Sequence, residues 1–155
     1  MTSLRRSAER RRFERTAHGL VDEIVAAVRE HIPAIRDLEL DEVRRMTIAE
    51  SVRGSAAVGE RRPPNDEELE GSEELTVSLA RAGVPLEAIN RSRRIAVRCV
   101  IDHWREQARQ AGQAVDLEDV YTLWNWCDAI MTRADVAYRR VEVEAQRQDE
   151  ERRRR

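Results

Sequence analysis

The chain has 155 residues, of which 41% are hydrophobic and 37% are charged, so it can form one domain with a modest core. Its formal net charge of −2 does not imply a general affinity for nucleic acid, and no apolar run approaches the roughly 20 residues of a membrane span. Cys99 and Cys127 are too few for a disulfide framework and are expected to be small core residues. We therefore expect a cytoplasmic protein without a membrane partner.

Residues 1–59 predict a charged arm and two helices. The arm, residues 1–16, holds the basic run LRRSAERRRFER and is expected to stay solvated. The first helix ends before Pro33, and its apolar side chains recur at Leu20, Ile24, Val28 and Ile32. The second helix opens near Asp41 and stops by Gly59, with an inward face expected at Leu40, Val43, Ile48 and Val52.

Loop signals then separate two further helices. GERRPPND, residues 59–66, predicts a loop in which Asn65 or Asp66 caps the third helix. That helix ends at Gly83, a residue suited to the left-handed conformation. The fourth helix runs from Pro85 to about residue 111, and its wide apolar face consists of Leu86, Ile89, Ala96, Val97, Val100, Ile101, Trp104 and Ala108.

The last predicted helix has the most regular pattern in the chain. Asp116 can cap it, and Leu123, Ile130 and Ala137 broaden the apolar face of its first half. Apolar residues alternate three and four positions apart, as in a heptad repeat, at Leu117, Val120, Trp124, Cys127, Met131, Ala134, Tyr138 and Val141. This stripe ends in the charged tail of residues 147–155. The pattern predicts a helix that pairs with a second copy of the chain and couples the domain to a downstream effector region.

Three segments together resemble a known bacterial regulatory domain. LARAGVPLEAINRSRRIAVRCVIDHW (79–104), EHIPAIRDL (30–38) and LWNWCDAIMTRADVAYRRVEVEAQ (123–146) are similar to the N-terminal domain of PucR-type transcriptional regulators. That domain is related to the RsbR N-terminal domain, whose globin-like fold lacks haem. The resemblance covers about residues 17–146. It implies an all-α regulatory domain of five main helices, globin-like or bundle-like, followed by a DNA-binding effector region.

Two polar residues on the fourth helix are candidates for contact with a ligand. Asn90 and Arg93 stand where the resembled family usually has apolar or aromatic residues. Arg93 interrupts the apolar face, and a buried guanidinium needs a carboxylate or a ligand beside it. These positions therefore predict either a polar ligand pocket or a buried ion pair.

Arg91, Arg94 and Arg98 fall on another side of the same helix. They form either a site for an acidic partner or a solvated face. In the second case Glu87–Arg91 and Arg98–Asp102 would be ion pairs spaced four residues apart, each contributing about 0.3–0.5 kcal/mol.

No residue pattern points to catalysis or to a bound cofactor. A haem site would need His18, His31 or His103 to face an aromatic-lined cavity, and aromatic residues make up only 4% of the chain. The cysteines and histidines lack the spacing of zinc ligands. We therefore expect no metal, no cofactor and no enzymatic activity.

The sequence as a whole predicts a non-catalytic regulatory input domain. It would form a homodimer through its last helix and transmit a change of state to a DNA-binding effector region. One alternative is a globin-like sensor that binds haem or an unknown small molecule. Another is a nucleic-acid-binding protein that uses the basic arm, whose six arginines lack a groove-reading helix beside them.

Overall fold

The computed structural model describes residues 19–155 and contains helices but no strand within that range. The first helix covers residues 19–31, and the others are α2 (Pro33–Arg36), α3 (Leu40–Gly59), α4 (Asp66–Arg81), α5 (Leu86–Gln110) and α6 (Leu117–Arg154). Since α2 is a single turn, five helices make up the body, and the predicted all-α fold with a long C-terminal helix is confirmed. The basic arm of residues 1–16 lies outside the described residues.

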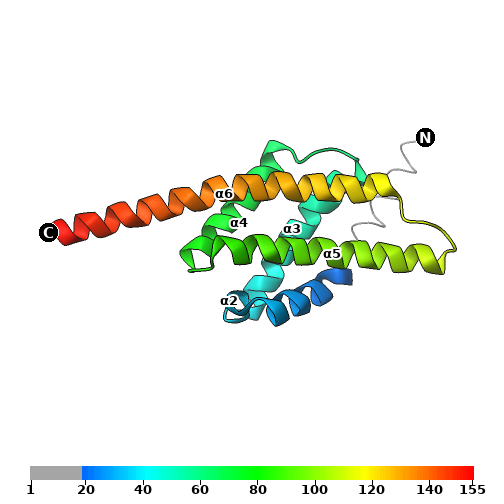
Figure 1. The fold of residues 1–155 in the computed structure, drawn as a ribbon, viewed down its shortest axis with the longest axis horizontal. Helices are drawn as coiled ribbons and strands as arrows, with labels where there is room; N and C mark the ends of the chain where they lie inside the picture. Colours follow the sequence, from blue (N-terminus) through cyan, green and yellow to red (C-terminus); the bar gives the residue numbers. More distant parts are fainter. Residues whose placement is uncertain (1–18) are drawn as a thin grey trace.

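Helix α6 is the axis around which the domain packs. It runs antiparallel to α5 and contacts α3 and α4 as well (Figure 1). The first helix and α2 lie on the other side of α5, against α3 (Figure 1). At about 1.5 Å per residue, the 38 residues of α6 span about 57 Å, and its C-terminal third extends beyond the packed body (Figure 1).

The first helix is held by its predicted apolar face. Leu20, Ile24, Val28 and Ile32 are all at most 5% exposed and belong to one core cluster with residues of α3, α4 and α5. Burial of each such aliphatic side chain stabilises the fold by about 1.5–3 kcal/mol. Pro33 ends the helix as predicted, because α2 starts anew at that residue.

Local capping signals set the ends of the later helices. The Asn65 side chain accepts from the backbone N–H of Glu68, whose carboxylate in turn accepts from the backbone N–H of Asn65. Gly83 has a φ of +83° at the end of α4, and Asp116 caps α6 by accepting from the backbone N–H of Glu118. The predicted boundaries at these residues are confirmed.

The inward face predicted for α3 is wrong at two positions. Leu40 and Val52 are 52% and 47% exposed. The helix instead buries small residues near its end, since the Trp126 ring lies about 3.6 Å from where a Cβ on Gly54 would stand. Because α3 packs closely on α6 here, the residues buried near the end of α3 are Gly54, Ser55, Ala57 and Val58.

Candidate functional site

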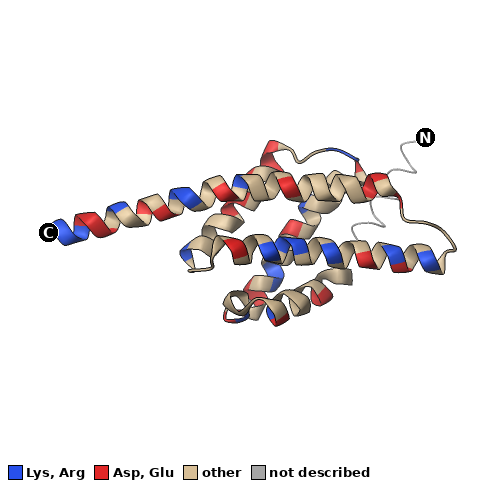
Figure 2. Cartoon of the chain, viewed as in Figure 1, with Lys and Arg blue, Asp and Glu red and all other residues tan. Residues whose placement is uncertain are grey.

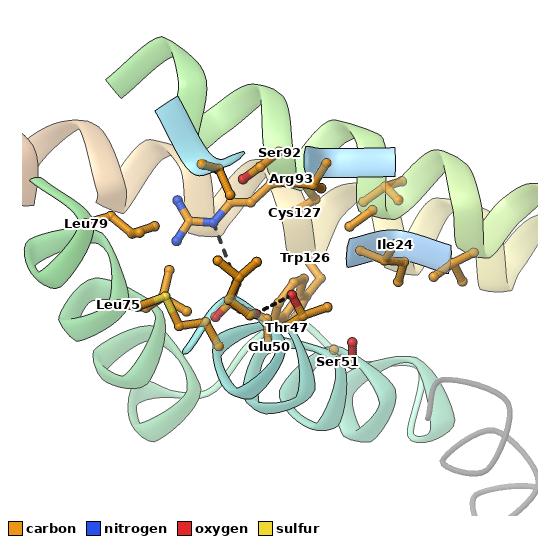
Figure 3. Close-up of a pocket in the computed structure, with 18 of the residues that line it drawn as sticks. Ile24, Thr47, Glu50, Ser51, Leu75, Leu79, Ser92, Arg93, Trp126 and Cys127 are labelled. Atoms are coloured by element: carbon orange, nitrogen blue, oxygen red, sulfur yellow. Dashed lines mark hydrogen bonds and ion pairs between the residues drawn. The ribbon is translucent and has the colours of Figure 1, made fainter. Parts of the chain in front are cut away.

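A cavity of about 130 Å³ lies between the first helix, α3, α4, α5 and α6 (Figure 3). Most of its lining is aliphatic, from residues such as Ile24, Val43, Leu79, Val97 and Leu123. A few polar side chains interrupt this lining, and Arg93 and Glu50 contact each other at one edge of it (Figure 3). The cavity is thus apolar with one charged edge.

Arg93 is the buried cation of this edge. It is 7% exposed, and its Nη2 donates to Thr76 Oγ1 at 2.9 Å and to the Ser72 carbonyl at 3.3 Å. Its Nε lies 3.5 Å from Glu50 Oε2, an ion-pair contact without a hydrogen bond. Glu50 is therefore the carboxylate that a buried guanidinium requires.

Glu50 is shared between two arginines. Its Oε1 accepts from Arg53 Nη2 at 2.7 Å and from the Ser72 hydroxyl. Arg53 lies over Gly71 of α4, where an added Cβ would stand 2.8 Å from Arg53 Nη1. The absence of a side chain at Gly71 thus leaves room for this second cation.

Several buried donors around the cavity have no hydrogen-bond partner among the described residues. They are Arg93 Nε and Nη1, Ser55 Oγ and Trp126 Nε1, contributed by α5, α3 and α6. The sequence indicated Arg93, because it breaks an apolar face, and Trp126, as part of an aromatic cluster with Tyr121 and Trp124, but it carried no signal for Ser55 or Glu50. Their grouping depends on how α3 packs on α5 and α6.

Asn90 lies outside this cavity. Its Nδ2 donates to Asp135 Oδ1 at 3.1 Å and thereby joins the start of α5 to the middle of α6. The two candidate ligand residues, Asn90 and Arg93, are therefore not brought to one site, and only Arg93 lines the cavity.

The Cys127 thiol also lines the cavity and is unreactive. It is 1% exposed, and burial raises its pKa to about 11, with the charge of Glu50 acting in the same direction and that of Arg93 against it. The thiol therefore stays protonated at neutral pH and is a poor nucleophile.

The heptad stripe of α6 divides into two rows. In the inward row, Cys127 and Ala134 are each 1% exposed, and Val120 and Val141 are half-buried. In the outward row, Leu117 and Trp124 are 64% and 42% exposed, Met131 and Tyr138 are half-buried, and Ala145 is exposed. The inward row thus belongs to the core of the single chain. In the outward row, Met131 and Tyr138 also pack against that core, whereas Leu117, Trp124 and Ala145 are exposed at the surface.

Arg91, Arg94 and Arg98 are exposed, and none of them forms an ion pair within residues 19–155. Neither the Glu87–Arg91 pair nor the Arg98–Asp102 pair is formed, and Asp102 instead contacts Arg105 at 3.7 Å. The arginine face is therefore open to a partner.

Other kinds of site find little support in the described part of the chain. No histidine lines the cavity, and no group of three or more His, Cys, Asp or Glu side chains in residues 19–155 is placed to hold a metal ion. None of the described helices is apolar enough over a sufficient length to span a membrane. The basic arm proposed for nucleic acid lies outside the described residues, so that alternative stays a prediction.

Comparison with known families bears on this helical body. The family described as the RsbT co-antagonist protein rsbRD N-terminal domain matches residues 18–153. The chain belongs to this family. The rsbRD N-terminal domain is a regulatory domain, in agreement with the RsbR part of the resemblance. No curated protein and no solved structure matches the chain.

Proposed function

We propose that this rsbRD N-terminal domain is a non-catalytic input domain that dimerises through α6 and passes a change of state along that helix. The observation that carries the proposal is the end of α6, where every residue from 142 to 155 is exposed (Figure 1). An unpacked helical segment of this length is marginally stable in water. A second helix beside it would supply the missing packing.

The outward row of α6 supports a second copy of the chain as that partner. Its members recur every seven residues, the spacing that keeps one seam facing a supercoiled neighbour. They are Leu117, Trp124, Met131, Tyr138 and Ala145. The large exposed members lie at the start of α6 and give the pairing most of its apolar area.

Opposite charges on α5 and α6 also support a twofold pairing (Figure 2). The Asn90–Asp135 bond places an acidic row of α6, which includes Asp128 one heptad earlier, beside α5. Arg94 lies one helical turn after Asn90, on the same side of α5. A surface with a basic row next to an acidic row is self-complementary under a twofold axis, so that α5 of one copy meets α6 of the other.

A charge-reversal experiment tests this pairing. One chain carries R91E, R94E and R98E, and a second carries D128R and D135R. In a homodimer of either chain, α5 of one copy and α6 of the other would carry charges of the same sign. Each chain alone should therefore be monomeric by light scattering. Their mixture restores opposite charges in both contacts and should form a heterodimer.

The control for this experiment is E74R, a reversal at an exposed carboxylate of α4. It should dimerise like the unmodified chain. Homodimers of both reversed chains, with the stability of the unmodified dimer, would refute the proposed interface.

We further infer that the domain acts in the cytoplasm and that its output is transcriptional. The support is the resemblance of residues 79–104 and 123–146 to the N-terminal domain of PucR-type regulators. The coding sequence downstream of Arg155 should then encode a helix-turn-helix region. A stop codon or an enzyme domain at that place would contradict this part of the proposal.

A further inference from the structure

We propose that the cavity around Arg93 binds a small monocarboxylate with a compact apolar body. This inference deepens the proposed function, since it names the chemical class of the signal and rests on that function for its regulatory meaning. Binding itself can be measured without reference to dimerisation.

The size and lining of the cavity define the apolar part of the ligand. Its volume is about 130 Å³, and an apolar protein cavity of about 150 Å³ is large enough to take up benzene. Met46, Ser51 and Leu75 line the cavity and are only partly buried, so the space is not sealed from solvent. A benzene-sized ring or a short aliphatic chain therefore fits.

The unpartnered polar atoms define the other part of the ligand. A guanidinium and an indole N–H can only donate hydrogen bonds, and the Ser55 hydroxyl can donate as well. Arg93, Trp126 and Ser55 carry these donors and line the cavity from three different helices. A buried donor without an acceptor is costly, so the group that completes this site is an acceptor with several lone pairs.

The local charge selects an anion. Arg93 and Arg53 contribute two positive charges, whereas Glu50, which contacts both, contributes one negative charge. Glu50 Oε1 accepts from Arg53 and Ser72, and Glu50 Oε2 contacts Arg93 Nε at 3.5 Å without accepting a hydrogen bond, so Arg93 Nε and Nη1 both lack an acceptor. Within the cavity lining Arg93 and Glu50 carry one charge of each sign, and Arg53, which contacts Glu50 from outside the lining, adds a second positive charge. This balance can compensate one carboxylate but not the second charge of a phosphate dianion.

The same cavity touches the helix that we propose for dimerisation. Leu123, Trp126 and Cys127 of α6 form part of its wall. An occupant therefore has direct contact with α6 and can bias the position of that helix if it binds one arrangement more tightly than another.

Titration calorimetry of the full chain tests the site with defined probes. Sodium benzoate and sodium hexanoate carry both parts of the ligand, acetate carries only the charge, and benzyl alcohol carries only the apolar body. At least one of the first two should bind saturably, with a dissociation constant of about a millimolar or below, and at least about tenfold more tightly than acetate or benzyl alcohol.

Matched variants locate the binding. R93M should weaken it by about 10- to 100-fold, since charge-assisted hydrogen bonds are lost. R94Q, which removes the adjacent but exposed arginine, should not change it. A96L narrows the cavity without removing a charge and should also reduce binding. It therefore tests the site independently if R93M does not fold.

Three results would overturn the proposal. They are absence of binding by both larger carboxylates, equal binding of benzyl alcohol, and unchanged binding in R93M or in A96L. Light scattering without probes reports the dimer separately. Absence of carboxylate binding would therefore not contradict the proposed dimer interface. A monomeric chain would likewise not contradict carboxylate binding in the cavity.

Discussion

Arg93 and Glu50 form a nearly dry pair whose two members are not equally replaceable. The Glu50 side chain, 17% exposed, has Arg53 as a second cation, whereas Arg93 has Glu50 as its only carboxylate among the described residues. Removing the Glu50 carboxylate leaves the buried charge of Arg93 without a counter-charge. Removing Arg93 does not leave Glu50 unpaired, because Arg53 still contacts it. The asymmetry makes Glu50 the residue on which this part of the core depends.

The variant E50Q should therefore destabilise the fold by about 3 kcal/mol or more, the usual effect of leaving a buried charge uncompensated. Urea unfolding followed by circular dichroism measures this. The control is E42Q on the same helix, whose pair with Arg45 is exposed at 3.7 Å and should change stability by less than about 1 kcal/mol. Equal effects of the two variants would show that Arg93 does not need Glu50.

Glu68 gives the fold a dependence on acid pH. Burial opposes its ionisation, but hydrogen bonds from Arg62, at 2.6 Å to Oε1, and from the Asn65 backbone outweigh that cost, so the pKa of Glu68 lies below the ordinary 4.5. A carboxyl with a lowered folded pKa stabilises the fold above its unfolded pKa. This stabilisation is lost as the pH falls through the folded pKa.

The variant E68Q should be less stable than the unmodified chain by about 1 kcal/mol at neutral pH, because glutamine can retain the cap but not the charge. The difference should shrink towards zero as the pH falls below 4.5, the ordinary carboxyl pKa. Unfolding free energies across this range measure it. A difference independent of pH would mean that the Arg62 pair contributes nothing.

At the scale of the elements, α6 has two parts with different requirements. Up to Tyr138 it packs against α3, α4 and α5, and the Tyr138 hydroxyl donates to the Val84 carbonyl at 3.1 Å. Beyond residue 141 no residue is buried, and in the sequence RQDEERRRR helical backbone hydrogen bonds are joined by one local ion pair, Arg152–Asp149 at 4.0 Å. In the proposed dimer, a second copy of the chain would stabilise the helical structure of this second part.

Hydrogen exchange of residues 142–154 tests this stabilisation. In a paired α6 these amides should be protected, and protection should fall when the chain is diluted below its dimer dissociation constant. Amides of the inward row near Ala134 are buried within one chain and serve as the internal control. Fast exchange of residues 142–154 at every concentration would contradict pairing along this segment.

The element boundaries could be predicted because their signals are local. Asn65, Gly83 and Asp116 each end or begin a helix through bonds and dihedral angles within a few residues. The inward face of α3 was predicted correctly at Val43 and Ile48. Its C-terminal part could not be predicted, since Gly54 is buried there by Trp126 of a helix far along the chain, whereas Val52 is exposed. Periodicity alone carries no information about which neighbour a helix face meets.

At the scale of the whole molecule, the candidate site could also be predicted only in part, because the sequence pattern does not show which distant residues the fold brings together. The sequence indicated that Arg93 needs a partner, but Glu50 lies 43 positions away and is brought to it by the tertiary fold. The heptad stripe of α6 was visible in the sequence, but a stripe cannot separate packing within a chain from packing between chains. The structure assigns Cys127 and Ala134 to the first kind and leaves Leu117 and Trp124 exposed.

Helix α6 lines the cavity and also projects from the packed body of the domain (Figure 1). Trp126 lines the cavity, and Trp124, two residues earlier on α6, is exposed on the outward row. In the proposed function, ligand contact and partner contact would lie on two faces of this one helix, which would couple the two sites.

The association state in solution tests most directly the claim that two copies of the chain pair through α6. Light scattering of the purified chain should give twice the 18.0 kDa of one copy, with dissociation upon dilution and loss of the dimer in W124E. A mass of 18.0 kDa at every concentration, with the unmodified chain and W124E indistinguishable, would contradict the account.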